Sequence, residues 1–141
     1  TGFRPMSPEM GWAYDENYEL YNTMASTILY ATTAVYLPDG VDVTQVTVYY
    51  YADNFILPSV DAWLIRTPLS GGSYTEMAYL TYYTDTGYNF ETDTTIQEPT
   101  IDNQNYAYFV KVGIGSFGPS LRLTGLRLDY EYTTYLSTIM K

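Results

Sequence analysis

Hydrophobic and polar residues alternate most regularly along residues 106–114, which read YAYFVKVGI. One parity holds Tyr106, Tyr108, Val110, Val112 and Ile114, and the other holds Ala107, Phe109, Lys111 and Gly113. A period of two is typical of a half-buried strand, because successive side chains point to opposite faces of a sheet. Turn-forming residues precede and follow the segment. The pattern predicts a strand whose apolar face needs a second sheet to cover it.

Similar patterns, rich in β-branched and aromatic residues, predict further strands along the chain. They cover residues 27–37, 41–52, 62–66, 76–83, 95–101 and 121–132, with turns of Gly, Pro, Asn and Asp between them. Pro99 predicts that residues 95–101 form an edge or bulged strand. Residues 85–95 are polar apart from Tyr88 and Phe90, and no strand is predicted there.

Two of the predicted strands change parity part-way along. The change falls at Thr44 and Gln45 in residues 41–52, and at Thr124 and Gly125 in residues 121–132. The inserted residue of a β-bulge produces such a change, and a glycine is often found at one. We therefore predict a bulge or a break at each place, with Leu126, Leu128, Tyr130 and Tyr132 on one parity after the second.

Eight or so short strands with turns between them predict an all-β fold, an antiparallel β-sandwich with jelly-roll or Greek-key connections. No apolar period of 3.6 residues is sustained for three turns, so no helix is predicted. Residues 25–132 would form the sandwich. Residues 1–24, broken by Pro5, Pro8 and Gly11, are interpreted as an extended N-terminal arm, with a first strand and a long loop as the alternative. Residues 133–141 are a C-terminal extension.

Composition restricts function mainly by exclusion. The 141 residues are 46% hydrophobic, enough for one domain with a real core. Cysteine and histidine are absent, which removes disulfides, thiolate and imidazole metal ligands, and Ser-His-Asp or Cys-His catalysis. A net charge of −10 argues against nucleic acid and anionic membrane surfaces. No apolar run approaches the roughly 20 residues of a membrane span.

The 16 acidic residues suggest two kinds of functional site, a Ca²⁺ site and a catalytic pair of carboxylates. Asp53, Asp61 and Asp102 are candidate Ca²⁺ ligands because carboxylates in turns suit that ion, although their spacing is not that of an EF-hand. The alternative is that such residues bond their own backbone. Paired carboxylates hydrolyse glycosides in some enzymes, but nothing distinguishes one pair here. We therefore predict a protein that is not an enzyme, with no catalytic residue, resident metal or cofactor.

Tyrosine is abundant, with 18 residues, and several aromatic residues have the parity opposite to the predicted core. Outward aromatic strips build protein interfaces and also stack on sugars, and we favour the core and a subunit interface. The predicted interface residues are Phe3, Trp12, Tyr14, Tyr49, Tyr51, Trp63, Tyr135, Leu136 and Ile139. Lys111, which has an outward parity, is expected to be solvated.

The C-terminal extension is itself β-prone. Thr134, Leu136, Thr138 and Met140 alternate with Tyr135, Ser137 and Ile139. Ordering each residue costs about 1–2 kcal/mol, and burying each apolar side chain returns about 1.5–3 kcal/mol. The segment therefore needs a full ladder of backbone hydrogen bonds as well, which the sheet edge of a neighbouring subunit would supply by strand addition. Lengthening of the last strand, or fraying, is the alternative.

Several blocks of the sequence resemble a domain that recurs in hypothetical secreted bacterial proteins. They are Gly2-Phe3-Arg4-Pro5, Leu37-Pro38-Asp39-Gly40 with Val46-Thr47-Val48 and Tyr49-Tyr50-Tyr51, Leu64-Ile65-Arg66-Thr67-Pro68-Leu69, Asp93-Thr94-Thr95-Ile96, Ile101-Asp102-Asn103 with Tyr106-Ala107-Tyr108, and the strand at 121–130. The resemblance implies a β-sandwich and an exported setting, and no catalytic residues. The family pattern stops near Tyr130, whereas this chain continues.

The leading hypothesis is an exported structural protein, at the cell surface or outside the cell, that binds copies of itself and forms a fibre or filament. Strand addition through a terminal arm is the expected route, and the sequence leaves open which arm donates. The alternative is a carbohydrate-binding or adhesin module, or a viral fibre head, with glycans as partners.

Overall fold

The computed structural model describes residues 4–5, 11–14, 17, 19–24, 27–53, 59–83, 86–115 and 120–133. The strands are β1 (Arg4–Pro5), β2 (Trp12–Tyr14), β3 (Leu20–Asn22), β4 (Leu29–Val35), β5 (Val41–Ala52), β6 (Ser59–Pro68), β7 (Thr75–Tyr83), β8 (Gly87–Asp93), β9 (Tyr106–Ile114) and β10 (Leu121–Tyr132). No helix occurs in these residues, as predicted, and so none there is long and apolar enough to cross a membrane.

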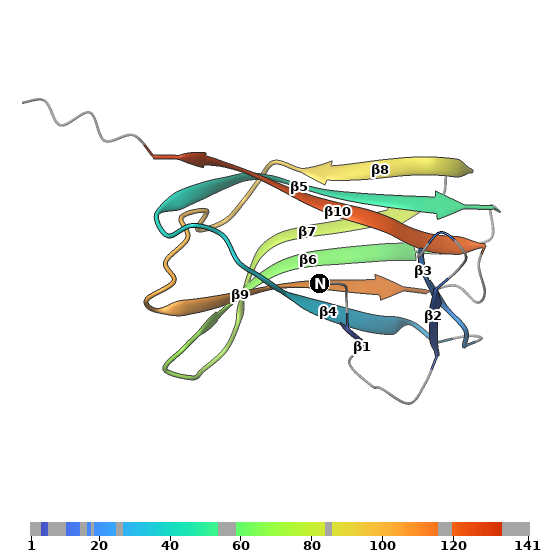
Figure 1. Ribbon diagram of the computed structural model, residues 1–141, viewed down its shortest axis with the longest axis horizontal. Helices are drawn as coiled ribbons and strands as arrows, with labels where there is room; N and C mark the ends of the chain where they lie inside the picture. The colour runs from blue at the N-terminus through green and yellow to red at the C-terminus, as the bar shows by residue number, and fades with distance from the viewer. Residues whose placement is uncertain are drawn as a thin grey trace, which may run out of the picture.

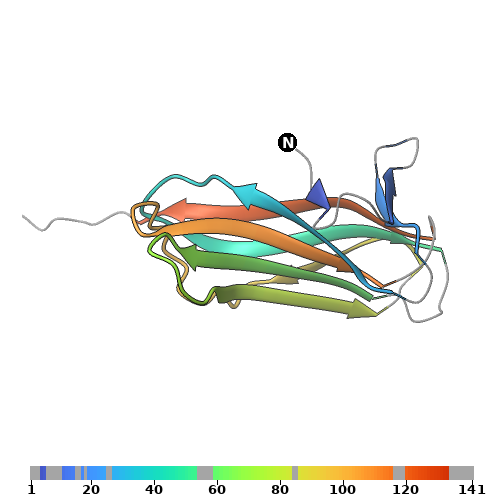
Figure 2. The same cartoon turned by 90° about the horizontal axis from the view of Figure 1, so that it is seen from below.

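The strands form two antiparallel sheets packed face to face (Figures 1 and 2). Sheet A has the order β1-β4-β9-β6-β7, and sheet B has the order β2-β3-β10-β5-β8. Without β1 and β2, the two orders are those of a jelly roll, in which the chain crosses repeatedly between the two sheets. The predicted all-β sandwich is therefore confirmed, with jelly-roll connections.

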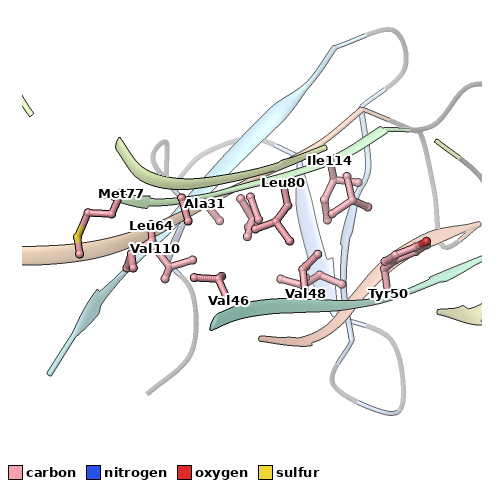
Figure 3. Close-up of a cluster of buried hydrophobic side chains, with 14 of the residues drawn as sticks. Ala31, Val46, Val48, Tyr50, Leu64, Met77, Leu80, Val110 and Ile114 are labelled. Carbon is pink, nitrogen blue, oxygen red and sulfur yellow. The ribbon is translucent and has the colours of Figure 1, made fainter. Parts of the chain in front are cut away.

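The core lies between the two sheets and consists mainly of aliphatic side chains. Figure 3 shows Val46 and Val48 of β5 pointing toward Leu80 of β7 in the opposite sheet. The valines are fully buried. On β9, Tyr108, Val110, Val112 and Ile114 are buried as their parity predicts. Alternation along β5 and β9 thus places one apolar face of each strand inside the sandwich.

Both predicted bulges occur in the ladder between β5 and β10. The register shifts fall between the pairs Gln45–Asp129 and Val43–Tyr130, and between Tyr50–Leu123 and Tyr49–Gly125. Thr44 is therefore the extra residue of β5, and Thr124 is the extra residue of β10. Each insertion turns the apolar parity back toward the core.

Two predictions for residues 85–101 are wrong. Residues 87–93 form β8, which pairs with β5 at the edge of sheet B. Its alternation is inverted, with Tyr88 and Phe90 exposed, because an edge strand does not have to contribute to the core. Residues 95–101 form no strand and are assigned an isolated bridge between Thr100 and Asp42, and Glu98 has a φ of 49°, which a strand does not tolerate.

The described part of residues 1–24 forms three short strands on the sandwich. β1 pairs with β4, while β2 and β3 form a hairpin that extends sheet B. Asn22, at the end of β3, is fully buried. Its side-chain amide donates to the carbonyls of Thr27 (2.7 Å) and Ile114 (3.0 Å), and its Oδ1 accepts from the N–H of Met24 (2.7 Å). This one side chain ties sheet B to sheet A.

Candidate functional site

β10 is paired along its length on one side but only at its start on the other. It pairs with β5 from Leu121 to Tyr132, whereas β3 reaches only Arg122 and Leu123 (Figure 1). From Thr124 to Tyr132 no strand of the described part of the chain pairs with β10 on that side. In an antiparallel sheet about half of the backbone groups of a strand face each neighbour. β10 therefore presents an open row of backbone donors and acceptors, which can pair with an added strand.

Apolar side chains accompany this open edge on the inner side of the sheet. Leu126, Leu128, Tyr130 and Tyr132 lie opposite Val48, Val46, Val43 and Val41 of β5. The four valines are at most 2% exposed, whereas the two leucines are only partly buried and the tyrosines are 41% and 68% exposed. We call Leu126, Leu128, Tyr130 and Tyr132 the β10 strip. Among the described residues, no strand lies beside β10 next to this strip.

β4, in sheet A, is open in the same way. It pairs with β9 throughout, but β1 meets only Ala31 and Thr32 on its other side. Thr33 and Val35 face inward, because they pair with buried residues of β9, yet both are only partly buried. β4 and β10 both lie toward the sheet ends that begin with β1 and β2, whereas β7 and β8 lie at the opposite ends, so in the described residues this side of the sandwich is the incompletely covered one.

The strands at the other ends of the two sheets are protected from strand addition. On β7, the N–H of Tyr79 donates to Asp93 Oδ2 (3.3 Å), and the N–H of Gln97 donates to the carbonyl of Met77 (2.8 Å). On β8, the positions that face the other sheet include Asn89 and Glu91, which an apolar added strand would have to desolvate. Covering segments and inward-facing charges are common ways of blocking an edge.

A row of aromatic rings on the outer face of sheet A encloses Lys111. The Lys111 ammonium lies 4.3 Å from the ring centroid of Tyr30 and 5.0 Å from that of Trp63. Tyr79 stacks on Trp63 at 5.2 Å. Trp63 thus has a partner on each neighbouring strand, and its ring is not left as a flat platform for a sugar. The expectation that Lys111 is solvated is wrong, because cation–π contacts hold it partly buried.

The outer face of sheet B is built around Tyr51. The guanidinium of Arg122 lies 4.1 Å from its ring centroid, and the Tyr88 ring lies 4.8 Å away. The Tyr51 hydroxyl donates to Asp53 Oδ1 (2.6 Å), and this bond raises the pKa of Tyr51 above its ordinary value. Tyr51 is therefore fixed by its neighbours.

Tyr88 and Phe90 on β8 are the most open rings of this face, with 65% and 63% of their surface exposed. The Phe90 ring also contacts Tyr49 at 5.9 Å. The two residues are two positions apart on the edge strand, so both side chains point outward.

The predicted interface residues are therefore distributed over several surfaces. Tyr49, Tyr51 and Trp63 lie on the outer faces of the two sheets, in contact with other rings. Trp12 and Tyr14 belong to β2, and Phe3, Tyr135, Leu136 and Ile139 lie outside the described residues. The β10 strip was not predicted as an interface. The sequence shows that these four residues share one apolar parity. Their exposure depends on the length of β3, which the sequence pattern does not give.

The three candidate Ca²⁺ ligands do not converge. Asp53 accepts from Tyr51, whereas Asp61, within β6, accepts from the hydroxyl of Tyr79 (3.2 Å). Asp102, in the loop before β9, accepts from the side-chain amide of Asn105 (2.7 Å), and this bond is the main cause of its lowered pKa. Among the residues described by the structure, no group of three or more acidic side chains could hold a metal ion. Asp102 has the backbone-bonding role of a turn residue.

No protein-family model matches the chain, and a search of curated proteins found no match. The resemblance to a secreted bacterial domain therefore stays a prediction. Function has to be inferred from the geometry of the chain itself.

Proposed function

We propose that this protein is an exported structural protein whose copies assemble into an extracellular fibre or filament by strand addition. The observation that carries the proposal is the open edge of β10 beside the β10 strip. An edge of this length with apolar inward side chains is a liability in a protein that stays a monomer. A dedicated strand from another copy would satisfy both the backbone groups and the side chains.

Such an assembly is open-ended. The acceptor surface is an edge of the sandwich, while the donor is a terminal arm, so the contact joins two different surfaces. Heterologous contacts of this kind form helical filaments when they do not close into a ring. The extracellular setting is supported by the resemblance to secreted domains, and the net charge of −10 suits a protein that does not bind nucleic acid.

Electron microscopy of the purified full chain tests the proposal directly. We expect negatively stained filaments of uniform width, and sedimentation of polymers that persist when the protein is diluted. Particles that sediment as monomers at every concentration, with no filaments on the grid, would contradict it.

Carbohydrate binding is the second candidate function, and the exposure of Tyr88 and Phe90 favours it. Outward rings on a sheet can stack on sugar faces, and jelly rolls include lectins, although a shared fold does not establish a shared function. A glycan array probed with the monomeric protein tests this. Binding should be lost in a Tyr88→Ala/Phe90→Ala variant and kept in Tyr36→Ala, which alters a ring that is 91% exposed outside the sheets. Absence of glycan binding by the unaltered protein would remove this candidate.

A further inference from the structure

We propose that residues 134–141 of one copy are the strand that pairs with β10 of the next copy, along Thr124–Tyr132 and against the β10 strip. This inference rests on the proposed assembly and names its two contact surfaces. The acceptor is the incompletely covered side of the sandwich. The donor lies outside the described residues and is identified by its sequence and by the connection that precedes it.

The acceptor position exists because β3 is short and pairs only with Arg122 and Leu123 at the start of β10. Leu20 pairs with Leu123 on β10 and with Tyr14 on β2. A longer β3 would continue along β10 past Thr124, but β3 begins at Leu20. Among the described residues, no strand occupies the position in line with β3 beside Thr124–Tyr132.

The donor has the composition of a strand. Residues 134–141 read TYLSTIMK, of which four residues are β-branched or aromatic, and they contain neither Gly nor Pro. Their one charged residue is Lys141, whereas all 16 acidic residues lie in the rest of the chain. Asp129 and Glu131 belong to the acceptor strand itself. Arg127 in the same stretch pairs with Asp129, so the acceptor stretch keeps a net charge of about −1, which favours the segment that carries Lys141, in addition to its β propensity.

The same segment lacks the residues that most favour a tight turn back onto its own β10. A tight hairpin needs residues such as Gly, Asn, Asp or Pro at the turn, and residues 132–141 contain none of them. Thr133 comes directly after β10. Its hydroxyl donates to Oδ2 of Asp42 (2.9 Å), the β5 residue that pairs with Glu131. A second copy offers an acceptor that the segment can reach without a turn.

The N-terminal arm is a poorer donor. Arg4 and Pro5 already pair with β4 of their own copy. Pro5 and Pro8 also lack the N–H that a ladder requires, so this segment could not form a continuous set of backbone hydrogen bonds with β10.

Two variants and their mixture test the inference. A chain that lacks residues 134–141 keeps the acceptor but has no donor. Leu128→Asp keeps the donor but places a charge within the acceptor, where the apolar donor would have to bury it. We expect each variant alone to be monomeric and the mixture to form a one-to-one dimer, measured by light scattering after size-exclusion chromatography. Leu69→Asp, the same substitution at a residue that is 61% exposed after β6, is the matched control and should assemble like the unaltered chain.

A second measurement does not depend on the folding of Leu128→Asp. A labelled synthetic peptide of residues 133–141 should bind the truncated chain with one-to-one stoichiometry in fluorescence anisotropy, and a scrambled peptide should not bind. Truncated protein that polymerises as the full chain does, or that fails to bind the peptide, would overturn the inference and leave the proposed function standing if the full chain forms filaments. A full chain that never polymerises would instead refute the proposed function.

Discussion

Leu123 lies opposite Leu20 in the ladder between β10 and β3, and in the described part of the chain it is the last β10 residue with a strand on both sides. Leu123 is 4% exposed, whereas Tyr132, later on the same strand, is 68% exposed. Both are large apolar residues that face the inside of the sandwich. Leu123 has a strand on each side, whereas Tyr132 is paired only with β5 in the described residues.

Replacing Asn22 by Ala should destabilise the fold strongly. The substitution removes the bonds to the carbonyls of Thr27 and Ile114 in a fully buried site, and unsatisfied buried groups cost about 1–3 kcal/mol. Urea unfolding gives the change in free energy. Asn103→Ala, which removes a similar bond to the carbonyl of Leu37 in an exposed loop, should cost clearly less. Equal losses in the two variants would contradict the proposed role of Asn22.

The contact between Lys111 and Tyr30 should contribute measurable coupling energy. A cation over a ring is worth about 0.5–1 kcal/mol at partly exposed sites. A double-mutant cycle with Lys111→Met and Tyr30→Leu, read by urea unfolding, measures this term because Met retains most of the aliphatic stem. Strictly additive effects would show that the ammonium contributes nothing through the ring.

Gly113→Ala should disturb the contact between Lys111 and the Tyr30 ring. A Cβ at Gly113 would lie 2.9 Å from the Tyr30 ring, so the ring must move, and overpacking of this kind costs about 1–3 kcal/mol. Gly125→Ala is the control, since its Cβ would meet Tyr49 at an ordinary 3.9 Å, and it should be neutral or stabilising. Thermal unfolding of both variants gives the comparison. A Gly113→Ala protein as stable as the control would show that the ring adapts without loss.

The loop that precedes β9 should loosen only in acid. Hydrogen bonds, first from the Asn105 side chain, lower the pKa of Asp102 below its ordinary 3.8. The stabilisation is therefore complete above the unfolded pKa and is lost as the pH falls through the lowered folded pKa. An NMR titration of the Asn105 side-chain amide should have its midpoint below pH 3.8, and the Asp102→Asn protein should show no such transition. A midpoint at or above 3.8 would contradict this.

Alternation was enough to predict most of the strands and both bulges, because the core needs one apolar face per strand. β8 was missed because an edge strand can carry Tyr88 outward and Glu91 inward without harm to the core. The contacts of Lys111 were also beyond a sequence pattern, since they depend on Gly113 allowing Tyr30 close to the sheet. Likewise, the parity of Leu126 and Leu128 predicted burial, but their partial exposure results from the start of β3 at Leu20.

Amide hydrogen exchange along β10 tests the central claim most directly. In the monomer, residues of Thr124–Tyr132 whose N–H faces β5 should exchange slowly, and those whose N–H faces the open edge should exchange fast. After assembly we predict slow exchange at all of these positions, because a strand from another copy pairs with the open edge. Fast exchange at the outward-facing amides within the polymer would contradict the account.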